Sequence, residues 1–436
     1  MLSTPITVFE HQTLETGEQG LSDDDWEALC RFNDRHGNKY FTTGFKRVTF
    51  TSYVGTLQVG DKVIEILPKA DHLSPQSEEI KKKWQRALLW MLHKAGYVTL
   101  NATENAVQQL QQLHLLDIFL YAYLQEINFL LHNGLVRKYR RARGEQYALR
   151  GRLMIDKQVR FNLVHRERFY TEHTVYDRDH RLNQVLKTAL EIVRDVSLRT
   201  DIRLWADEYL LSFEPVSAWR GRASELQRLS FNRKTIRYAG AIELAKMIIL
   251  HYHPDMTAGK SSVIALLFDM NRLFEQLVYQ LLSSSAAKFE SSDVTVSPQD
   301  EQYFWKDKTL RPDLKIEFSK SDSAGNRTRH RVMGDSKWKM IAAGDPDPHD
   351  LRQMFAYNIR YGATRSVLIY PATGQVSTSL ANFEKFEGDS SADHGCETYF
   401  MGLFTAEGEP DEDAGAKFIK HLIDTTVSER IRKDQH

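Results

Sequence analysis

The chain has 436 residues, and its 58 lysines and arginines balance its 58 aspartates and glutamates, so the formal net charge is zero. Hydrophobic residues make up 42% and charged residues 27% of the chain, which excludes a disordered, collagenous or disulfide-scaffold protein. At roughly 100–200 residues per domain, the length predicts two to four domains. A zero balance argues against a nucleic-acid partner only if the charges are spread evenly along the chain.

Neither the cysteines nor the apolar runs indicate an extracellular or membrane protein. Cys30 and Cys396 are the only cysteines and lie far apart, which disfavours a disulfide framework or a cysteine-based zinc site. The N-terminal stretch lacks the basic-then-apolar order of a signal peptide. Since no apolar run approaches the roughly 20 residues that cross a bilayer, we expect a cytoplasmic protein with no membrane partner.

The first two thirds of the chain are predicted to form two regions. Residues 1–75 indicate a β-rich module that binds a partner, with strands at 45–50, 53–59 and 62–67 and a turn at Gly60-Asp61. Residues 76–255 indicate a mainly helical, basic region. Helices are expected at 84–95 and 106–131, where apolar side chains recur at helical spacing.

Charge is distributed unevenly along the chain. Residues 137–168 hold eleven lysines and arginines against three acids, whereas residues 384–413 hold ten acids against Lys385. Aromatic residues lie within the basic stretch, so two interpretations stay open: a solvated face, or contact with DNA or an acidic partner. The arginines proposed for such contact are Arg140, Arg141, Arg143, Arg150 and Arg152.

Residues 256–436 are predicted to form an α/β domain, which makes the expected fold class α+β multidomain. A helix is predicted at 263–282, followed by short strands at 294–296 and 302–305. Longer strands are predicted at 310–318 and 331–340, then a helix at 349–359 and a buried strand at 366–370. This order includes the series α-β-β-β-α-β, which is typical of a nuclease core in which carboxylates converge at one edge of a sheet.

Candidate catalytic residues lie on the two longer predicted strands. Pro312-Asp313 opens one strand, and Asp335-Ser336-Lys337 ends the next. Mg²⁺ prefers one or two carboxylates, with water and substrate phosphate as further ligands, and it promotes phosphodiester hydrolysis. Because side chains alternate along a strand, Lys337 is expected on the same face as Asp335, where its ammonium group could orient a water molecule.

Six segments of the chain resemble one known family. The stretches LFDMNRLFEQLVYQLL, Leu-Arg-Pro-Asp at 310–313, GDSKWK at 334–339 and DLRQMFAYN at 350–358 are similar to the PD-(D/E)xK nuclease domain of the McrC family. McrC is the nuclease subunit of the McrBC modification-dependent restriction systems. VGTLQVGDKVIEILPKA at 54–70 and LRGRLMIDKQVRFN at 149–162 also resemble McrC.

This resemblance implies a function and roles for single residues. It implies a DNA endonuclease that uses Mg²⁺ or Mn²⁺ and depends on an McrB-like AAA+ ring, which hydrolyses GTP and reads modified cytosine in DNA. The N-terminal part would dock on that ring and stimulate its GTPase. By position, Asp313 and Asp335 would bind metal, Lys337 would be the catalytic lysine, Glu275 an upstream helix carboxylate, and Gln353 a supporting residue.

Two other functions stay open on the sequence alone. One is a stand-alone DNA repair or recombination nuclease, and the other is a non-catalytic adaptor that stimulates an AAA+ GTPase. Nucleotide binding by this chain is not expected, since Gly259-Lys260-Ser261 resembles the end of a phosphate loop but the required first glycine is Pro254. The polar segment from Asp177 to Asn183 is expected to cap a helix and to make contacts between domains.

Overall fold

The computed structural model describes residues 5–68, 78–97, 114–253, 263–321, 327–341, 345–372, 378–384 and 393–433. The chain divides into two compact units, one built mainly from residues 99–266 and the other from residues 5–57, 62–98 and 267–436. Both units combine helices and strands, as expected for an α+β protein. The division into three domains stays a prediction.

The N-terminal part of the second unit is rich in strands. The predicted strands at 53–59 and 62–67 are confirmed as β5 and β6, and they lie beside β1 in the order β1-β6-β5. β2, β3 and β4 form a separate three-stranded sheet. The elements of this part are β1 (Ile6–Phe9), β2 (Thr13–Glu15), η1 (Glu18–Gly20), α1 (Asp23–Arg35), β3 (Phe41–Gly44), β4 (Arg47–Phe50), β5 (Tyr53–Val59), β6 (Lys62–Leu67) and α2 (Glu78–Lys94).

The helix α1 was not predicted, although its start carries a clear sequence signal. Ser22 accepts a hydrogen bond from the backbone N–H of Asp25, and the Asp25 carboxylate accepts one from the N–H of Ser22. Such reciprocal bonds satisfy N–H groups that have no partner in the first turn of a helix.

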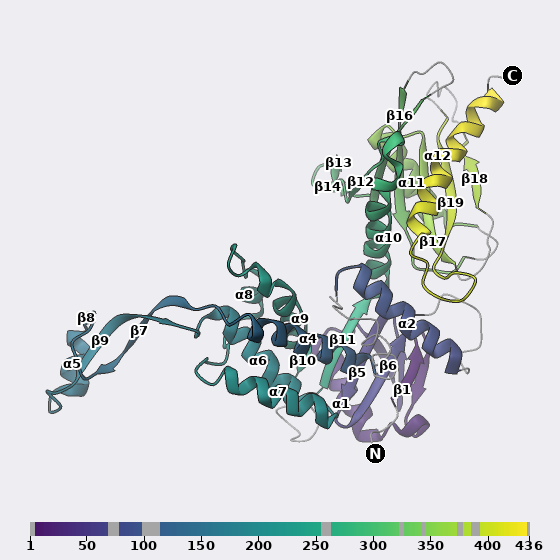
Figure 1. Ribbon diagram of the computed structural model, residues 1–436. Coiled ribbons are helices and arrows are strands. Elements are labelled where there is room, and N and C mark those ends of the chain that lie inside the picture. Colours follow the sequence, from purple (N-terminus) through teal and green to yellow (C-terminus); the bar gives the residue numbers. More distant parts are fainter. Residues whose placement is uncertain are drawn as a thin grey trace. The chain divides into compact units, whose positions relative to one another are not determined.

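The C-terminal part of the same unit is a six-stranded mixed sheet with helices (Figure 1). The strand order is β12-β15-β16-β17-β19-β18, and β16, β17 and β19 run parallel to one another. Helix α11 covers one face through a buried cluster that includes Met333, Met354 and Tyr357. The elements are α10 (Met270–Ala286), η3 (Ala287–Ser292), β12 (Thr295–Pro298), β13 (Gln302–Trp305), β14 (Lys308–Leu310), β15 (Leu314–Ser321), β16 (Arg327–Ser336), α11 (Pro348–Tyr361), β17 (Arg365–Ala372), β18 (Ser379–Asn382), β19 (Gly395–Gly402) and α12 (Ala414–Lys433).

The single predicted helix at 263–282 is wrong in its first third. Residues Val263–Asp269 form the strand β11, and α10 begins only at Met270. Six consecutive residues of β11 are buried, so the run is apolar on both faces, and periodicity cannot distinguish such a strand from a buried helix. The signal that marks the boundary is Asp269, whose side chain accepts hydrogen bonds from the N–H groups of Asn271 and Arg272 as the N-cap of α10.

The first unit has a helical body, as predicted for the middle of the chain, but it also contains strands. Helix α4 begins at Leu115, and the predicted helix residues 106–113 lie outside the described residues. The elements of this unit are α4 (Leu115–His132), β7 (Lys138–Gln146), β8 (Arg152–Leu153), α5 (Ile155–Asn162), β9 (Phe169–Asp177), α6 (Arg181–Val196), α7 (Thr200–Ser212), α8 (Ala223–Gln227), η2 (Ile236–Tyr238), α9 (Ala239–His251), and β10 (Tyr252–His253), which pairs with β11 (Val263–Asp269).

The basic stretch of the sequence forms a long antiparallel ribbon, here called the arm (residues 138–177). β7 and β9 pair along nine residues each, and β8 adds a short third strand beside β9 (Figure 1). Gly151 makes this packing possible, because a Cβ atom there would lie 2.4 Å from the carbonyl oxygen of Glu172. The middle region is therefore not helical throughout.

Among the described residues, no helix is both long and apolar enough to span a membrane. The helix α4 contains the longest apolar run of the sequence. It packs within the first unit, where side chains such as Phe119, Tyr123 and Ile127 are buried.

A buried carboxyl group in α4 predicts a pH-dependent stability. Burial raises the pKa of Asp117 from 3.8 to about 6, although the nearby Arg199 acts to lower it. The contribution of this group is favourable below about pH 4 and is lost as the pH rises through 6, because the unfolded chain ionises more readily than the folded one. Asp117→Asn should therefore raise the free energy of unfolding at pH 8 by on the order of 2–3 kcal/mol, and by less at pH 5.

The measurement is thermal or urea unfolding of both proteins at pH 5 and pH 8. Asp201→Asn is the matched control, because Asp201 is exposed and pairs with Arg199 at 2.7 Å, so its replacement should give no gain. A loss of stability at pH 8 on replacing Asp117 would show that the ionised carboxylate is favourable in the folded state.

Candidate active site

Asp313 and Asp335 lie at the same end of two paired strands. Asp313 immediately precedes β15, and Asp335 is the penultimate residue of β16. β15 and β16 are antiparallel, with Leu314 opposite Gly334, so the start of one strand meets the end of the other. The structure corrects the prediction in detail, since Asp313 and Lys337 flank the strands rather than belonging to them.

Ser336 fixes the Asp313 carboxylate. Oδ2 of Asp313 accepts hydrogen bonds from the backbone N–H of Ser336 at 2.8 Å and from its hydroxyl group at 2.9 Å. Burial raises the pKa of Asp313, although these hydrogen bonds and the charge of Lys337 act in the opposite direction. The strand that carries Asp335 therefore also orients its neighbouring carboxylate.

Asp335 is the most buried acid of the site, with 2% of its surface exposed. Burial and the neighbouring Asp313 carboxylate raise the pKa of Asp335 to about 7. Its partner is Lys337, whose Nζ lies 2.5 Å from Oδ2 of Asp335. Burial lowers the pKa of Lys337, but the surrounding carboxylates outweigh it and the net shift is upward, so the ammonium form is stabilised.

Lys337 reaches Asp335 although it lies beyond β16. Its backbone N–H donates to the carbonyl oxygen of Ile369 at 2.9 Å, which continues the parallel pairing with β17 past Ser336. The backbone thus stays extended for one more residue, and the expected alternation of side chains still places Lys337 and Asp335 together.

Helix α11 supports the lysine. Nζ of Lys337 donates to Oε1 of Gln353 at 3.4 Å, and the Gln353 amide donates to the Tyr357 hydroxyl group at 2.6 Å. The Tyr357 hydroxyl group in turn donates to the carbonyl oxygen of Arg311 at 3.0 Å. This chain of hydrogen bonds connects Lys337 to the segment that precedes Asp313. The structure thus places Gln353 beside the lysine.

The acid on α11, Asp350, gives the two lysines of GDSKWK different partners. Lys339 Nζ lies 2.6 Å from Oδ2 of Asp350, whereas Lys337 Nζ is 3.9 Å from Oδ1 of the same residue. Lys339 is thereby held by the helix, and Lys337 is the lysine that contacts Asp335. Sequence reasoning did not identify this buried aspartate as part of the site.

Glu275 also approaches the site, from α10. Burial and the negative charge of Asp313 raise its pKa, and a hydrogen bond from Gln299 opposes the shift. The Gln299 side-chain amide donates to Oε1 of Glu275, while its backbone N–H donates to the carbonyl oxygen of Asp313 at 3.1 Å. Gln299 therefore couples the helix to the first aspartate, a role that no motif in the sequence signalled.

Trp338, the residue that follows Lys337, is fixed by contacts with other elements. Its indole N–H donates to Oε1 of Glu10 at 2.7 Å, and both side chains are buried. The ring packs edge-on against Trp84 and Phe274, with ring centres 6.5 and 5.3 Å apart. The N-terminal strand β1, through the residue that follows it, thus helps to fix the GDSKWK segment from 328 residues away.

Two carboxylates and one lysine fit a magnesium site of the open kind. Among the described residues there is no group of three or more His, Cys, Asp and Glu side chains arranged to hold a metal ion. Mg²⁺, however, needs only one or two carboxylates and takes its other ligands from water and phosphate. Asp313 and Asp335 are side chains whose anionic forms are penalised by burial and mutual repulsion, and a divalent cation would relieve that penalty.

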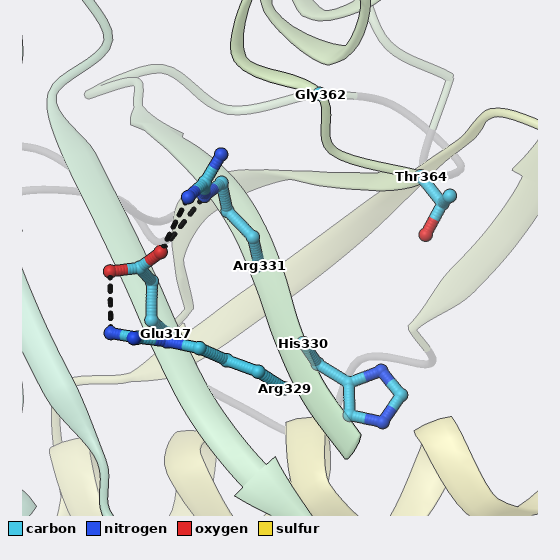
Figure 2. Close-up of a pocket in the computed structure, with 6 residues that line it drawn as sticks. All are labelled: Glu317, Arg329, His330, Arg331, Gly362 and Thr364. Atoms are coloured by element: carbon cyan, nitrogen blue, oxygen red, sulfur yellow. Dashed lines mark hydrogen bonds and ion pairs between the residues drawn. The ribbon is translucent and has the colours of Figure 1, made fainter.

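An open cavity lies elsewhere on the same strands. It has a volume of about 340 Å³ and is lined by Glu317, Arg329, His330, Arg331, Gly362 and Thr364. Figure 2 shows Glu317 between two guanidinium groups, and the nearest distances are 3.1 Å to Arg329 and 2.8 Å to Arg331. Its acid is fully paired, so this cavity is not the candidate catalytic site.

The remaining sequence candidates have structural roles or lie outside the described residues. Gly259-Lys260-Ser261 and Pro254 are outside them. Asp177 and Asp179 pair with Arg140 at the base of the arm, and the Asn183 amide donates to the carbonyl oxygen of Arg178. His180 is the N-cap residue of α6 but makes no side-chain cap hydrogen bond, so the expected capping by this cluster is not seen there.

The five arginines proposed for DNA or partner contact all belong to the arm or its connecting loop, in the first unit. Arg140 is held internally by Asp177 at 2.8 Å. Arg141 and Arg143 are exposed and lie 3.9 and 3.5 Å from Glu172. Arg150 and Arg152 are exposed and make no ion pair with a described residue.

Comparisons with known proteins agree with this fold. Residues 48–371 match the family model described as "McrBC 5-methylcytosine restriction system component". The chain belongs to this family. A search of curated proteins finds no match.

Two solved structures are similar to the chain. One is titled "Refined half-complex from tetradecameric assembly of Thermococcus gammatolerans McrB AAA+ hexamers with bound McrC"; it has 19% identity and a TM-score of 0.67, and the match covers 96% of this chain and 100% of that one. The other, the cryo-EM structure of the Thermococcus gammatolerans McrBC complex, has 22% identity, a TM-score of 0.49, and coverage of 66% and 89%. The first likeness shows that the fold is shared.

Metal binding at the two aspartates predicts a thermal shift. A cation that binds the folded state alone stabilises it by RT ln(1 + [Mg²⁺]/Kd), which is about 2.7 kcal/mol at a hundredfold excess over Kd. Addition of Mg²⁺ to protein treated with EDTA should therefore raise the Tm by several degrees. Asp313→Asn combined with Asp335→Asn should remove this rise, and Asp300→Asn, which changes an acid paired with Lys315, should retain it.

Proposed function

We propose that this chain is the nuclease subunit of a McrBC-like restriction complex and hydrolyses phosphodiester bonds in DNA. The observation that carries the proposal is the contact between Lys337 and the buried Asp335 beside Asp313, at the end of two paired strands. The family to which the chain belongs comprises components of a 5-methylcytosine restriction system. The order of elements around the site, α10-β12-β15-β16-α11-β17 with the β13–β14 hairpin inserted, supports a PD-(D/E)xK nuclease core.

Each residue of the site has a defined task in this proposal. Asp313 and Asp335 would hold a Mg²⁺ or Mn²⁺ ion, which would polarise the phosphate and lower the pKa of water. Lys337, kept as an ammonium by the carboxylates around it, orients the attacking water molecule and neutralises charge that develops on the phosphate. Gln353 positions that ammonium group, and Glu275 adds a negative charge on the side of Asp313.

The proposed partner is an McrB-like AAA+ hexamer that hydrolyses GTP and reads modified cytosine in DNA. The first similar structure is titled as AAA+ hexamers of McrB with bound McrC. In this chain the arm presents an apolar surface to solvent, formed by exposed side chains of α5 and the residues that follow it: Ile155, Val159, Phe161, Leu163 and Val164. Exposed apolar side chains rimmed by arginines are typical of a protein interface. The arm is therefore proposed to dock on the partner together with the N-terminal module (residues 1–75), and this docking is proposed to stimulate the GTPase.

The cleavage test compares three single variants of the chain in complex with its partner. Asp335→Ala and Lys337→Met should each lower the cleavage rate by at least about a hundredfold, because the first removes a ligand of the metal ion and the second removes the ammonium group that neutralises charge on the phosphate. Lys339→Met is the matched control, since Lys339 pairs with Asp350 rather than with Asp335, and it should keep most of the activity. Undiminished cutting by Asp335→Ala would overturn the site assignment.

Two further outcomes of this experiment separate the other functions. Asp335→Ala should still stimulate the GTPase of the partner, because docking belongs to another part of the chain. Robust cutting with Mg²⁺ alone, without nucleotide or partner, would favour a stand-alone repair or recombination nuclease. GTPase stimulation with no cutting by the unaltered chain would favour a non-catalytic adaptor.

Docking through the arm predicts a loss of partner affinity when its exposed arginines are removed. Replacement of Arg141, Arg143, Arg150 and Arg152 by Ala should weaken binding to the AAA+ partner and flatten the dependence of log Kd on log salt. The measurement is the Kd between the two purified proteins at several salt concentrations. Arg140 is left unchanged, because its ion pair with Asp177 holds the base of the arm.

The control removes the same number of exposed arginines from the helical body of the first unit: Arg203, Arg220, Arg228 and Arg233. This variant should bind as the unaltered chain does. If the arm variant instead keeps its affinity for the partner and loses affinity for DNA, the arm is a DNA-binding surface. An unchanged salt slope for both ligands would mean that the arm is merely solvated.

A further inference from the structure

The hairpin β13–β14 (residues 302–310) exposes three consecutive aromatic side chains beside the candidate active site. Tyr303 is 67%, Phe304 54% and Trp305 65% exposed. None of the three rings packs against another aromatic ring among the described residues. Figure 1 shows the hairpin projecting from the side of the six-stranded sheet on which β12 is the edge strand. Such a concentration of exposed aromatic surface is unusual for a part without a binding role.

The two ends of the hairpin are held by α11, the helix that also contacts Lys337. The hydroxyl group of Tyr361 on α11 lies 2.8 Å from the carbonyl oxygen of Leu310 and also contacts that of Asp300. The Tyr357 hydroxyl group holds the carbonyl oxygen of Arg311. Asp313 follows Leu310 by only three residues, so the hairpin and the candidate metal-binding carboxylate share one anchored segment.

Positive charges accompany the aromatic rings. Lys306 lies in the turn, Lys308 is opposite Trp305 in the ladder, and Arg311 follows the second strand. All three side chains are exposed and make no ion pair with a described residue. Asp300 at the base is by contrast paired with Lys315 at 2.8 Å, and the two exposed acids of this segment, Glu301 and Asp307, are outnumbered by the three cations. The hairpin therefore offers unpaired cations that complement a phosphate backbone.

We infer that the β13–β14 hairpin is a DNA-binding element of the nuclease, in which Tyr303, Phe304 and Trp305 stack on or between bases next to the scissile phosphate while Lys306, Lys308 and Arg311 contact the backbone. This inference rests on the proposed DNA cleavage and adds a contact to bases near the cut. Base–aromatic stacking tolerates any sequence, because every base has a π face, and aromatic or apolar wedges that enter a base step unstack it. The hairpin would thus hold DNA distorted at the site without selecting its sequence.

The central variant replaces Tyr303, Phe304 and Trp305 by Ser. In the full complex it should raise the KM for DNA about tenfold or more, while stimulation of the partner's GTPase stays unchanged. The physical reason is that stacking is lost but the metal site and the docking arm are intact. The single variant Trp305→Phe keeps an aromatic face at this position and leaves the other two rings in place, so it should retain most of the affinity for DNA.

A second readout follows base unstacking directly. Duplex DNA that carries 2-aminopurine near the cut should become more fluorescent when bound by the Asp335→Ala complex, which binds without cutting. The triple hairpin change introduced into Asp335→Ala should abolish this rise. Folding of every variant is checked by its thermal unfolding curve.

Phe129→Ser is the matched control. Phe129 is 52% exposed on α4, a helix that belongs to the first unit and not to the unit that contains the hairpin. This variant should leave KM and the fluorescence rise unchanged.

Two results would refute the inference, and a third would refute the proposed function alone. An unchanged KM together with an unchanged fluorescence rise in the triple variant would refute the hairpin's role in DNA binding. A loss of GTPase stimulation with intact DNA binding would identify the hairpin as a protein interface and refute it equally. If the unaltered complex does not cut DNA, the proposed function fails, and the fluorescence measurement still tests the hairpin.

Discussion

The site depends on holding two carboxylates, Asp313 and Asp335, close together and away from water. Isolated from any partner, such a pair would be strongly unfavourable, because burial and like charge both oppose ionisation. The fold compensates with specific contacts: two hydrogen bonds from Ser336 to Asp313, and the ammonium group of Lys337 at 2.5 Å from Asp335. These contacts leave the site short of positive charge, which is the electrostatic condition for recruiting a divalent cation.

The rest of the second unit keeps these groups from moving apart. Helix α11 contributes Gln353 and Tyr357 to the lysine side and packs on the sheet through Met354 and Tyr361. From the N-terminal part, Glu10 and Trp84 fix Trp338, the residue that follows Lys337. The β-rich segment and the six-stranded sheet therefore belong to one compact unit, and a change in the former can disturb Lys337 through packing.

The zero net charge of the chain is the sum of an acidic and a basic segment, whose side chains differ in how far they are paired. The acids near the C-terminal end of the sheet are largely paired within their own unit: Glu409 with Arg86, Glu412 with Lys94, Asp413 with Lys288 and Asp411 with Lys417. Several arm cations, by contrast, make no ion pair with a described residue, among them Arg150 and Arg152. The acidic segment thus serves the fold, while the basic one leaves charge available for a partner, so the total charge says little about binding.

Much of the secondary structure could be predicted because it follows from local patterns. In the strands at 53–59 and 62–67, apolar side chains alternate with polar ones or follow one another, and turn residues bound each run. The helices α2 and α11 carry apolar residues at helical spacing. The pattern failed at 263–269, where burial on both faces removes the periodicity that distinguishes a strand from a helix. It also gave no indication that residues 138–177 fold back as a paired ribbon, because pairing of β7 with β9 is a long-range contact.

The candidate site, like the fold, could be predicted from the sequence only in part. The types and spacing of side chains near the ends of two predicted strands are enough to identify Asp313, Asp335 and Lys337 as candidates. Which of the two lysines contacts Asp335 depends on the packing of α11, because Asp350 on that helix pairs with Lys339 and leaves Lys337 beside Asp335. The tertiary structure also brought in Gln299, Ser336 and Glu10, whose roles depend on hydrogen bonds to distant residues. Such contacts are set by packing between elements, and no local pattern in a single sequence encodes them.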